Sequence, residues 1–106
     1  MKLLFDQGTP VPLRSHLKNH IVETAYERGW SNLPNGQLLK RTEAEGYDAL
    51  ITTEQNLSYQ QNLTGRKISI VVLMTTSWPR IKNHAGLVIQ AVDSLQPGSY
   101  LEIAIP

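Results

Sequence analysis

The sequence predicts an α/β protein with a mostly parallel sheet of about five strands in a three-layer α/β/α sandwich. Two observations lead to this fold class. Short apolar stretches alternate along the chain with longer segments whose apolar residues recur at helical spacing. Residues 68–74 form a nearly continuous apolar, β-branched run, which is typical of a central parallel strand buried on both faces. Strands that alternate with helices favour parallel pairing through right-handed crossovers.

The composition indicates one small domain that spans residues 1–106. A hydrophobic content of 41% is enough for a core, and a net charge of +1 means that any site for a polyanion has to be a local patch. The absence of cysteine excludes disulfides, zinc–thiolate sites and a thiol nucleophile. The apolar runs are too short to span a bilayer, and Asp6 interrupts the first one too early for a signal peptide. We therefore expect a soluble, cytoplasmic protein without a membrane segment.

Three strands and a helix that starts at proline are expected in the first half. The strand candidates are apolar stretches bounded by turn residues, at residues 2–5, 20–24 and 48–52. A helix between the first two begins at Pro10 or Pro12, because a missing N–H costs little in a first turn. Its Leu13 and Leu17 are four residues apart and should face the core.

A second helix is expected between the second and third strands. Asn35 is a candidate N-cap for it, and Gly46 is a candidate C-terminal stop. The residues on its inner face should be Leu38, Leu39 and Thr42.

The second half should contain two helices and two strands. A helix over residues 55–63 is followed by the strand over residues 68–74. The clearest helix has Ser77 as its N-cap and Pro79 in its first turn, and it should end at residues 97–98. Its apolar residues fall on one face, namely Ile81, Ala85, Val88, Ile89, Val92 and Leu95. An edge strand over residues 100–105 completes the sheet.

Acidic residues directly follow two of the expected strands. Asp6 comes after the first strand, and Glu54 follows the third. In an open parallel sheet, residues at the carboxyl ends of strands point into the crevice where ligands bind. Two carboxylates there suggest a cation, and we expect a single, weakly held Mg or Mn ion, or none without substrate. The alternatives are a turn residue for Asp6 and a first-turn helix acid for Glu54.

The order and spacing of several segments resemble the PIN-like proteins, a group related to PIN-domain ribonucleases. The segments that carry this resemblance are residues 3–7 followed by Pro10, residues 29–30, 35–39, 46–53 and 56–63. The resemblance covers the chain almost end to end and implies a PIN-like α/β/α domain. It further implies a metal-dependent endoribonuclease, of the kind found as the toxin of bacterial toxin–antitoxin pairs.

The resemblance also implies a site, in which Asp6 and Glu54 are the catalytic and metal-ligating residues. Active members carry a further acid near the start of the helix before the third strand, where this chain has Asn35 and Gln37. The third strand then runs into an acidic motif, which here contains Thr52, Thr53, Glu54 and Asn56. Asn56 keeps an oxygen but no charge. The expected supporting polar residues are Asn35, Gln37, Thr52, Thr53 and Asn56.

A polar segment with a basic end follows the third strand and is a candidate RNA-binding surface. Tyr59 offers a stacking face, and Gln60 and Gln61 offer hydrogen-bond donors. Arg66 and Lys67 would add contacts to phosphate. The alternative is a solvated helix face with a basic end that suits the helix dipole.

The residues leave two functions of different classes open. The first is a ribonuclease toxin with a small antitoxin-like protein as its partner. The second is a catalytically weak or inactive PIN-like module that binds RNA or a protein, which the amides at Asn35 and Asn56 favour. A receiver-like signalling domain ranks below both, because the third strand is followed by Glu54 and not by a phosphoacceptor Asp. The apolar last helix and edge strand would suit a homodimer.

Overall fold

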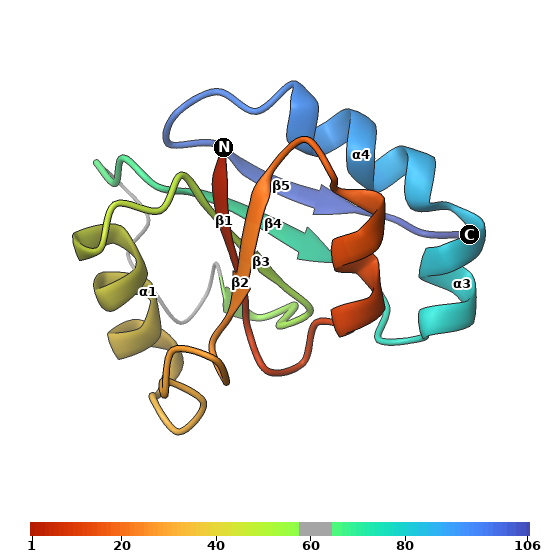
Figure 1. The fold of residues 1–106 in the computed structure, drawn as a ribbon. Helices are drawn as coiled ribbons and strands as arrows, with labels where there is room; N and C mark the ends of the chain where they lie inside the picture. Colours follow the sequence, from red (N-terminus) through yellow and green to blue (C-terminus); the bar gives the residue numbers. More distant parts are fainter. Residues whose placement is uncertain (58–64) are drawn as a thin grey trace.

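Five parallel strands form one sheet in the order β2-β1-β3-β4-β5. The computed structural model describes residues 1–57 and 65–106, and Figure 1 shows their arrangement. The strands are β1 (Lys2–Phe5), β2 (Ile21–Thr24), β3 (Ala49–Thr52), β4 (Ser69–Leu73) and β5 (Tyr100–Ile103). The prediction of a parallel α/β sheet of about five strands is confirmed. The helix expected over residues 55–63 lies mostly outside the described residues.

Apolar clusters cover both faces of the sheet, because alternate strand residues point in opposite directions. Leu3 and Phe5 of β1 join one cluster, which also contains residues of η1 (Val11–His16), α3 (Trp78–Asn83) and α4 (Ala85–Asp93). Leu4 joins the other cluster, against α1 (Asn35–Ala44). Figure 1 shows η1, α3 and α4 on one side of the sheet and α1 on the other. In the part of the chain that the structure describes, no helix is long and apolar enough to cross a membrane.

The proline-started helix is present, but it is a short 3₁₀-helix. Leu13 N–H donates to the carbonyl of Pro10 at 3.1 Å, and Leu17 N–H donates to Arg14 at the same distance. Both bonds span three residues, as in a 3₁₀-helix. Leu13 and Leu17 are buried as predicted. The segment thus covers the sheet with only six residues.

Helix α1 confirms most of the sequence-based expectations for this segment. Leu38, Leu39 and Thr42 are all buried on its inner side, and the chain leaves the helix through Gly46 with φ of 81°. The prediction of Asn35 as the N-cap is wrong by one residue. Pro34 occupies that position with φ −58° and ψ 156°, and Asn35 is the first residue of the helix.

The long helix expected after β4 is divided in two at His84. Ser77 caps α3 as predicted, since its hydroxyl accepts the N–H of Arg80. His84 then leaves the helical region with φ −125° and ψ 28°, and α4 starts at the next residue. The break lets Ile81 and Val88, which are both fully buried, reach the same core from two helix axes. The prediction that this helix ends at residues 97–98 is also wrong, because α4 ends at Asp93.

The connections between strands are not all of the same hand. The β1–β2 connection through η1 and the β4–β5 connection through α3 and α4 cross the sheet in opposite directions. Both connections nevertheless cover the same face. Two crossovers that run in opposite directions on one face have opposite hands, so the expectation of right-handed crossovers throughout is wrong for one of them.

A matched pair of glycine substitutions tests this description of the helices. Gly46 has a positive φ of 81°, whereas Gly86 lies within α4 and an added Cβ there would meet nothing within 4 Å. We expect Gly46→Ala to lower the free energy of unfolding by about 1 kcal/mol. Gly86→Ala should raise it by about 0.5 kcal/mol because alanine has the higher helix propensity. Urea denaturation measures both, and a stabilising Gly46→Ala would contradict the left-handed helix end.

Candidate functional site

The strand order places a crevice between β1 and β3. The chain runs from β1 outward to β2 and then returns past β1 to β3, so the direction of strand addition reverses between these neighbours. Ligands of open α/β sheets bind at the carboxyl ends of the strands at such a reversal. Asp6 directly follows β1, and Thr53 and Glu54 follow β3.

A cavity of about 290 Å³ lies at this point. Asp6 and Glu54 both line it, so the structure brings together the two acids that the sequence singled out. Asn35 and Thr53 line it as well, and Trp30 and Leu33 give it an apolar wall. Its other lining residues are Gln7, Gly8, Ala25, Ser31 and Leu38.

Two threonine hydroxyls hold the carboxylate of Asp6 in place. Thr9 Oγ1 lies 2.7 Å from Asp6 Oδ1, and Thr52 Oγ1 donates to Asp6 Oδ2. Both threonines are buried, and Thr52 is the last residue of β3. The acid after β1 is therefore fixed to the end of β3, which makes its position in the cavity rigid.

Burial raises the pKa of Asp6 above its ordinary value, although the hydrogen bonds from Thr52 and Thr9 act in the opposite direction. The geometry around Thr9 agrees with this direction. Thr9 Oγ1 lies 2.8 Å from the carbonyl oxygen of Ile51 and 2.7 Å from Asp6 Oδ1, but a hydroxyl has only one proton to donate. A protonated Asp6 can donate to Thr9, and Thr9 can then donate to Ile51. This arrangement accommodates the neutral acid, and the Ile51 carbonyl also accepts the Asp6 N–H at 3.1 Å.

Glu54 reaches the cavity from a tight turn after β3. Its backbone N–H donates to Thr52 Oγ1 at 3.0 Å, and its Oε1 accepts the backbone N–H of Asn56 at the same distance. The Thr52 hydroxyl therefore links both acids, because it donates to Asp6 and accepts from Glu54. Thr52 has an orienting role of the kind the sequence suggests for it.

Gly8 and Thr9 belong to the site, although the sequence alone suggested no role for them there. A Cβ on Gly8 would lie 2.7 Å from Thr53 Oγ1 and 3.9 Å from Asp6 Oδ1. Only glycine lets the loop after β1 approach the end of β3 so closely. A glycine two residues after the acid was the available signal, but a single glycine is also an ordinary turn residue.

Several residues that the sequence grouped with the site lie elsewhere. Gln37 lines a separate depression on α1 with Lys40 and Arg41, and Asn56 is exposed. Arg66 and Lys67 precede β4, so they lie at the amino end of the sheet, opposite the cavity. Tyr59, Gln60 and Gln61 lie outside the described residues.

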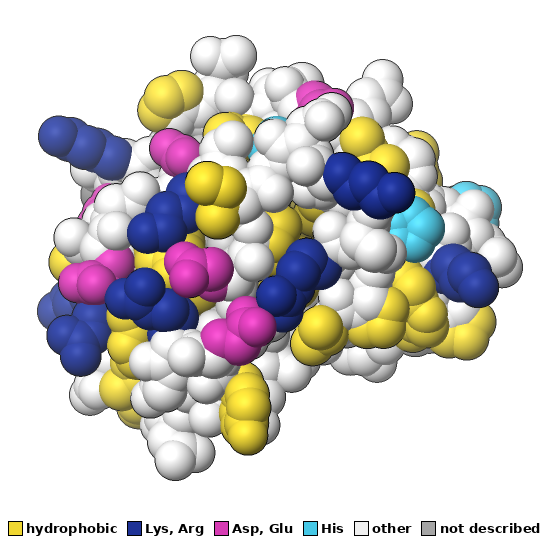
Figure 2. Space-filling model, in the orientation of Figure 1, with side chains coloured by type: hydrophobic (Ala, Val, Ile, Leu, Met, Phe, Trp, Pro, Cys, Tyr) yellow, Lys and Arg dark blue, Asp and Glu magenta, His cyan; other side chains and the backbone are white. Residues whose placement is uncertain are grey.

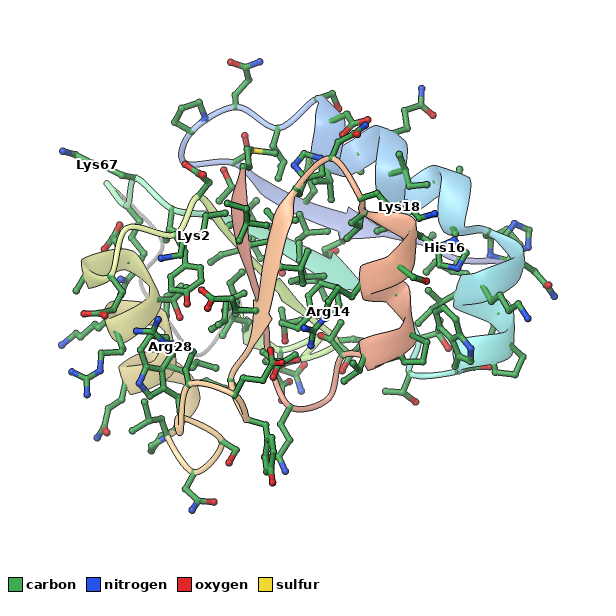
Figure 3. All side chains as sticks on the ribbon, viewed as in Figure 1. Lys2, Arg14, His16, Lys18, Arg28 and Lys67 are labelled. Atoms are coloured by element: carbon green, nitrogen blue, oxygen red, sulfur yellow. The ribbon has the colours of Figure 1, made fainter. Side chains whose placement is uncertain are left out.

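Glu43 holds the basic pair at that opposite end. Arg66 contacts Glu43 Oε1 at 3.4 Å, and the Lys67 N–H donates to Glu43 Oε2 at 2.8 Å. Figure 3 shows Lys67 far from Arg14, which lies near the carboxyl ends. The face drawn in Figure 2 carries basic and acidic side chains interspersed, without a continuous basic surface. A nucleic acid at the cavity would therefore not find Arg66 and Lys67 beside it.

The donor set of the cavity fits at most one hard divalent cation. The residues described contain no group of three or more His, Cys, Asp or Glu that could hold a metal. Two carboxylates with the amide of Asn35 and the hydroxyl of Thr53 are oxygen donors of the type that Mg and Mn prefer. Both oxygens of Asp6 already have a hydroxyl partner, which leaves less of their capacity for a metal.

Comparisons with known proteins identify no relative of this chain. No protein-family model, curated protein or solved structure matches this chain. The function of the chain therefore has to be inferred from the cavity between β1 and β3 and from its polar lining.

The raised pKa of Asp6 has a measurable effect on stability. Between the ordinary value of 3.8 and the higher folded value, the folded protein binds more protons than the unfolded chain. The stabilisation from Asp6 is therefore complete below pH 3.8 and is lost as the pH rises through the folded pKa. Asparagine does not titrate, so the Asp6→Asn protein does not lose stability in this way as the pH rises. We expect the stability of Asp6→Asn relative to the wild type to increase from about pH 4 to pH 7, measured by urea denaturation.

Glu102→Gln, on the exposed side of β5, is the control for removing an acid elsewhere. A difference between Asp6→Asn and the wild type that stays constant over this pH range would contradict the burial of the Asp6 carboxyl.

Proposed function

We propose that this chain is a PIN-like, metal-dependent endoribonuclease that hydrolyses RNA in the cavity between β1 and β3. One observation carries the proposal. Asp6 and Glu54 reach a single cavity from the carboxyl ends of adjacent strands, at the place where open α/β sheets bind ligands. Two carboxylates would repel a phosphodiester, so a phosphate substrate there requires a cation between them.

Asp6 and Glu54 would hold the Mg or Mn ion, and the bound ion would polarise a phosphoryl oxygen and activate water. Thr9 and Thr52 fix Asp6, so this ligand is preorganised. Asn35 and Thr53, which also line the cavity, offer polar groups to the phosphate. Trp30 and Leu33 give the cavity an apolar wall against which part of the RNA would pack.

A partner protein forms part of the proposal through the resemblance to toxin-type nucleases. A small antitoxin-like protein would have to block access to Asp6 and Glu54 to suppress cleavage. The exposed side chain of Tyr26 lies on the other side of the Asp6 loop, where such a protein could also make contact.

Cleavage of labelled single-stranded RNA with Mg or Mn tests the proposal. We expect the purified chain to cleave, and Asp6→Asn or Glu54→Gln to slow cleavage by about 100-fold or more. Glu102→Gln should cleave at the wild-type rate, because Glu102 lies on β5 at the far edge of the sheet.

Wild-type protein and Asp6→Asn that are equally inactive with both metals would rule out the ribonuclease. Equal activity of both would trace the cleavage to a contaminating enzyme.

A second candidate function is a PIN-like module that binds RNA or a protein without catalysis. The hydrogen bonds at Asp6 favour it, because both carboxylate oxygens already have hydroxyl partners and burial raises the pKa of the group. A neutral acid held in this way supports the crevice without a metal. Asn35 is also a neutral amide near the position where active PIN-like nucleases carry an acid, so the cavity has less negative charge than theirs.

Thermal unfolding with and without metal separates the two functions. A ligand at ten times its Kd stabilises the folded state by about 1.4 kcal/mol, which corresponds to a shift of several degrees in Tm for a domain of this size. The ribonuclease predicts such a shift with millimolar Mn, lost in Asp6→Asn. The non-catalytic module predicts no shift in either protein.

A further inference from the structure

A second cavity of about 300 Å³ lies on the other side of the loop that carries Asp6. It shares Asp6 and Gln7 with the first cavity. Val11 and Arg14 of η1 form one side, and Tyr26 and Glu27 from the turn after β2 form another. We propose that this cavity binds one nucleobase of a single-stranded RNA, next to the phosphate at Asp6. The inference deepens the proposed function and rests on it.

The arrangement of the two cavities suits consecutive parts of one nucleotide chain. Asp6 and Gln7 form the wall between them, so a phosphate in the first cavity has the second directly beside it. A volume of about 300 Å³ is at the lower end for small-molecule sites, which fits one nucleoside but not a longer segment.

Tyr26 offers the flat surface that a nucleobase requires. Its side chain is 78% exposed, and Val11 across the cavity is 53% exposed. Large side chains at the rim of a cavity, with most of their surface in water, gain by burial against an apolar ligand. Single-stranded RNA is recognised mainly by stacking of unpaired bases on aromatic side chains.

The charges around this cavity favour a base over a phosphate. Arg14 Nη1 and Nη2 each donate to an oxygen of Glu27 at 3.1 Å, so the guanidinium is paired with a carboxylate. The hydrogen bonds from Arg14 lower the pKa of Glu27 below its ordinary value. Asp6 is a second acid in the lining of this cavity. The Arg14 cation of this lining is neutralised by Glu27, so the cavity does not attract a free phosphate. The edge of a neutral base can accept a hydrogen bond from the guanidinium or donate one to a carboxylate.

Arg14 also has a donor that the fold leaves unused. Its Nε is buried and has no hydrogen-bond acceptor within residues 1–57 and 65–106. A buried donor without a partner is destabilising. Figure 3 shows Arg14 between η1 and the end of β2, beside the loop of Asp6.

Binding of RNA that contains 2-aminopurine tests the nucleobase site by a readout other than cleavage. The background is the slowly cleaving Glu54→Gln protein with Mg, because the phosphate at Asp6 requires a cation and Glu54 lines only the first of these two cavities. The fluorescence of 2-aminopurine falls when the base stacks. We expect the added Tyr26→Ala to weaken binding roughly 5- to 150-fold and to abolish the stacked signal, whereas Tyr26→Phe retains both.

Ile21→Ala is the matched control, since Ile21 is 66% exposed at the amino end of β2, away from the cavity. Unchanged binding by Tyr26→Ala, with RNA cleavage by the wild type, would overturn the nucleobase site and leave the ribonuclease standing. Binding that depends on Tyr26, with no cleavage under any metal, would support the nucleobase site and overturn the ribonuclease. Failure to bind RNA at all, or binding unaltered by every Tyr26 variant, would reject the nucleobase site.

Discussion

The hydrogen-bonded carboxyl group of Asp6 is the interaction on which the functional end of this fold depends. It joins three pieces of chain: the end of β1, the loop at Thr9, and the end of β3 at Thr52. The Asp6 N–H also donates to the carbonyl of Ile51 at 3.1 Å, so the ladder between β1 and β3 continues to the acid itself. The close approach of Gly8 to Thr53 results from the same arrangement. The backbone ladder sets the spacing of β1 and β3, and the carboxyl group adds the side-chain bonds that tie the loop at Thr9 to the end of β3.

The same carboxyl group would give the proposed metal site two chemical states. Burial shifts the pKa of Asp6 upward, toward the neutral acid, which can satisfy Thr9, Thr52 and the carbonyl of Ile51 together. A divalent cation would favour the ionised form and draw Asp6 and Glu54 together across the first cavity. The loop of Asp6 separates this cavity from the one lined by Tyr26. A change in the charge of Asp6 would therefore alter the electrostatic potential in both cavities.

The sequence predicts those parts of the fold whose signal is local. The β-branched run in β4 identifies a central strand, and the apolar positions of α1 identify its buried side, because both depend on short-range periodicity. The division of α3 from α4 at His84 was not predictable in this way. The apolar spacing from Ile81 to Val92 fits one helix or two, and only the packing of both segments on the sheet decides between them.

The site shows the same limit, since proximity along the chain is not proximity in the fold. Asp6 and Glu54 could be paired from the sequence because acids after parallel strands meet at one edge. Arg66 and Lys67 could not be placed, because the chain crosses from one end of the sheet to the other before β4 begins. Asn35 and Gln37 are two residues apart on α1, which is about 200° around a helix. One therefore lines the cavity while the other faces away from it.

The central claim is that Asp6 is a buried acid with a raised pKa that a divalent cation can convert to a ligand. A carbon-13 NMR titration of the Asp6 carboxyl group, with and without Mg, measures this directly. The expected result is a midpoint above the ordinary value of 3.8 in metal-free protein, which moves to lower pH when Mg is added. A midpoint at or below that value, unchanged by Mg, would contradict both the buried acid and the metal site.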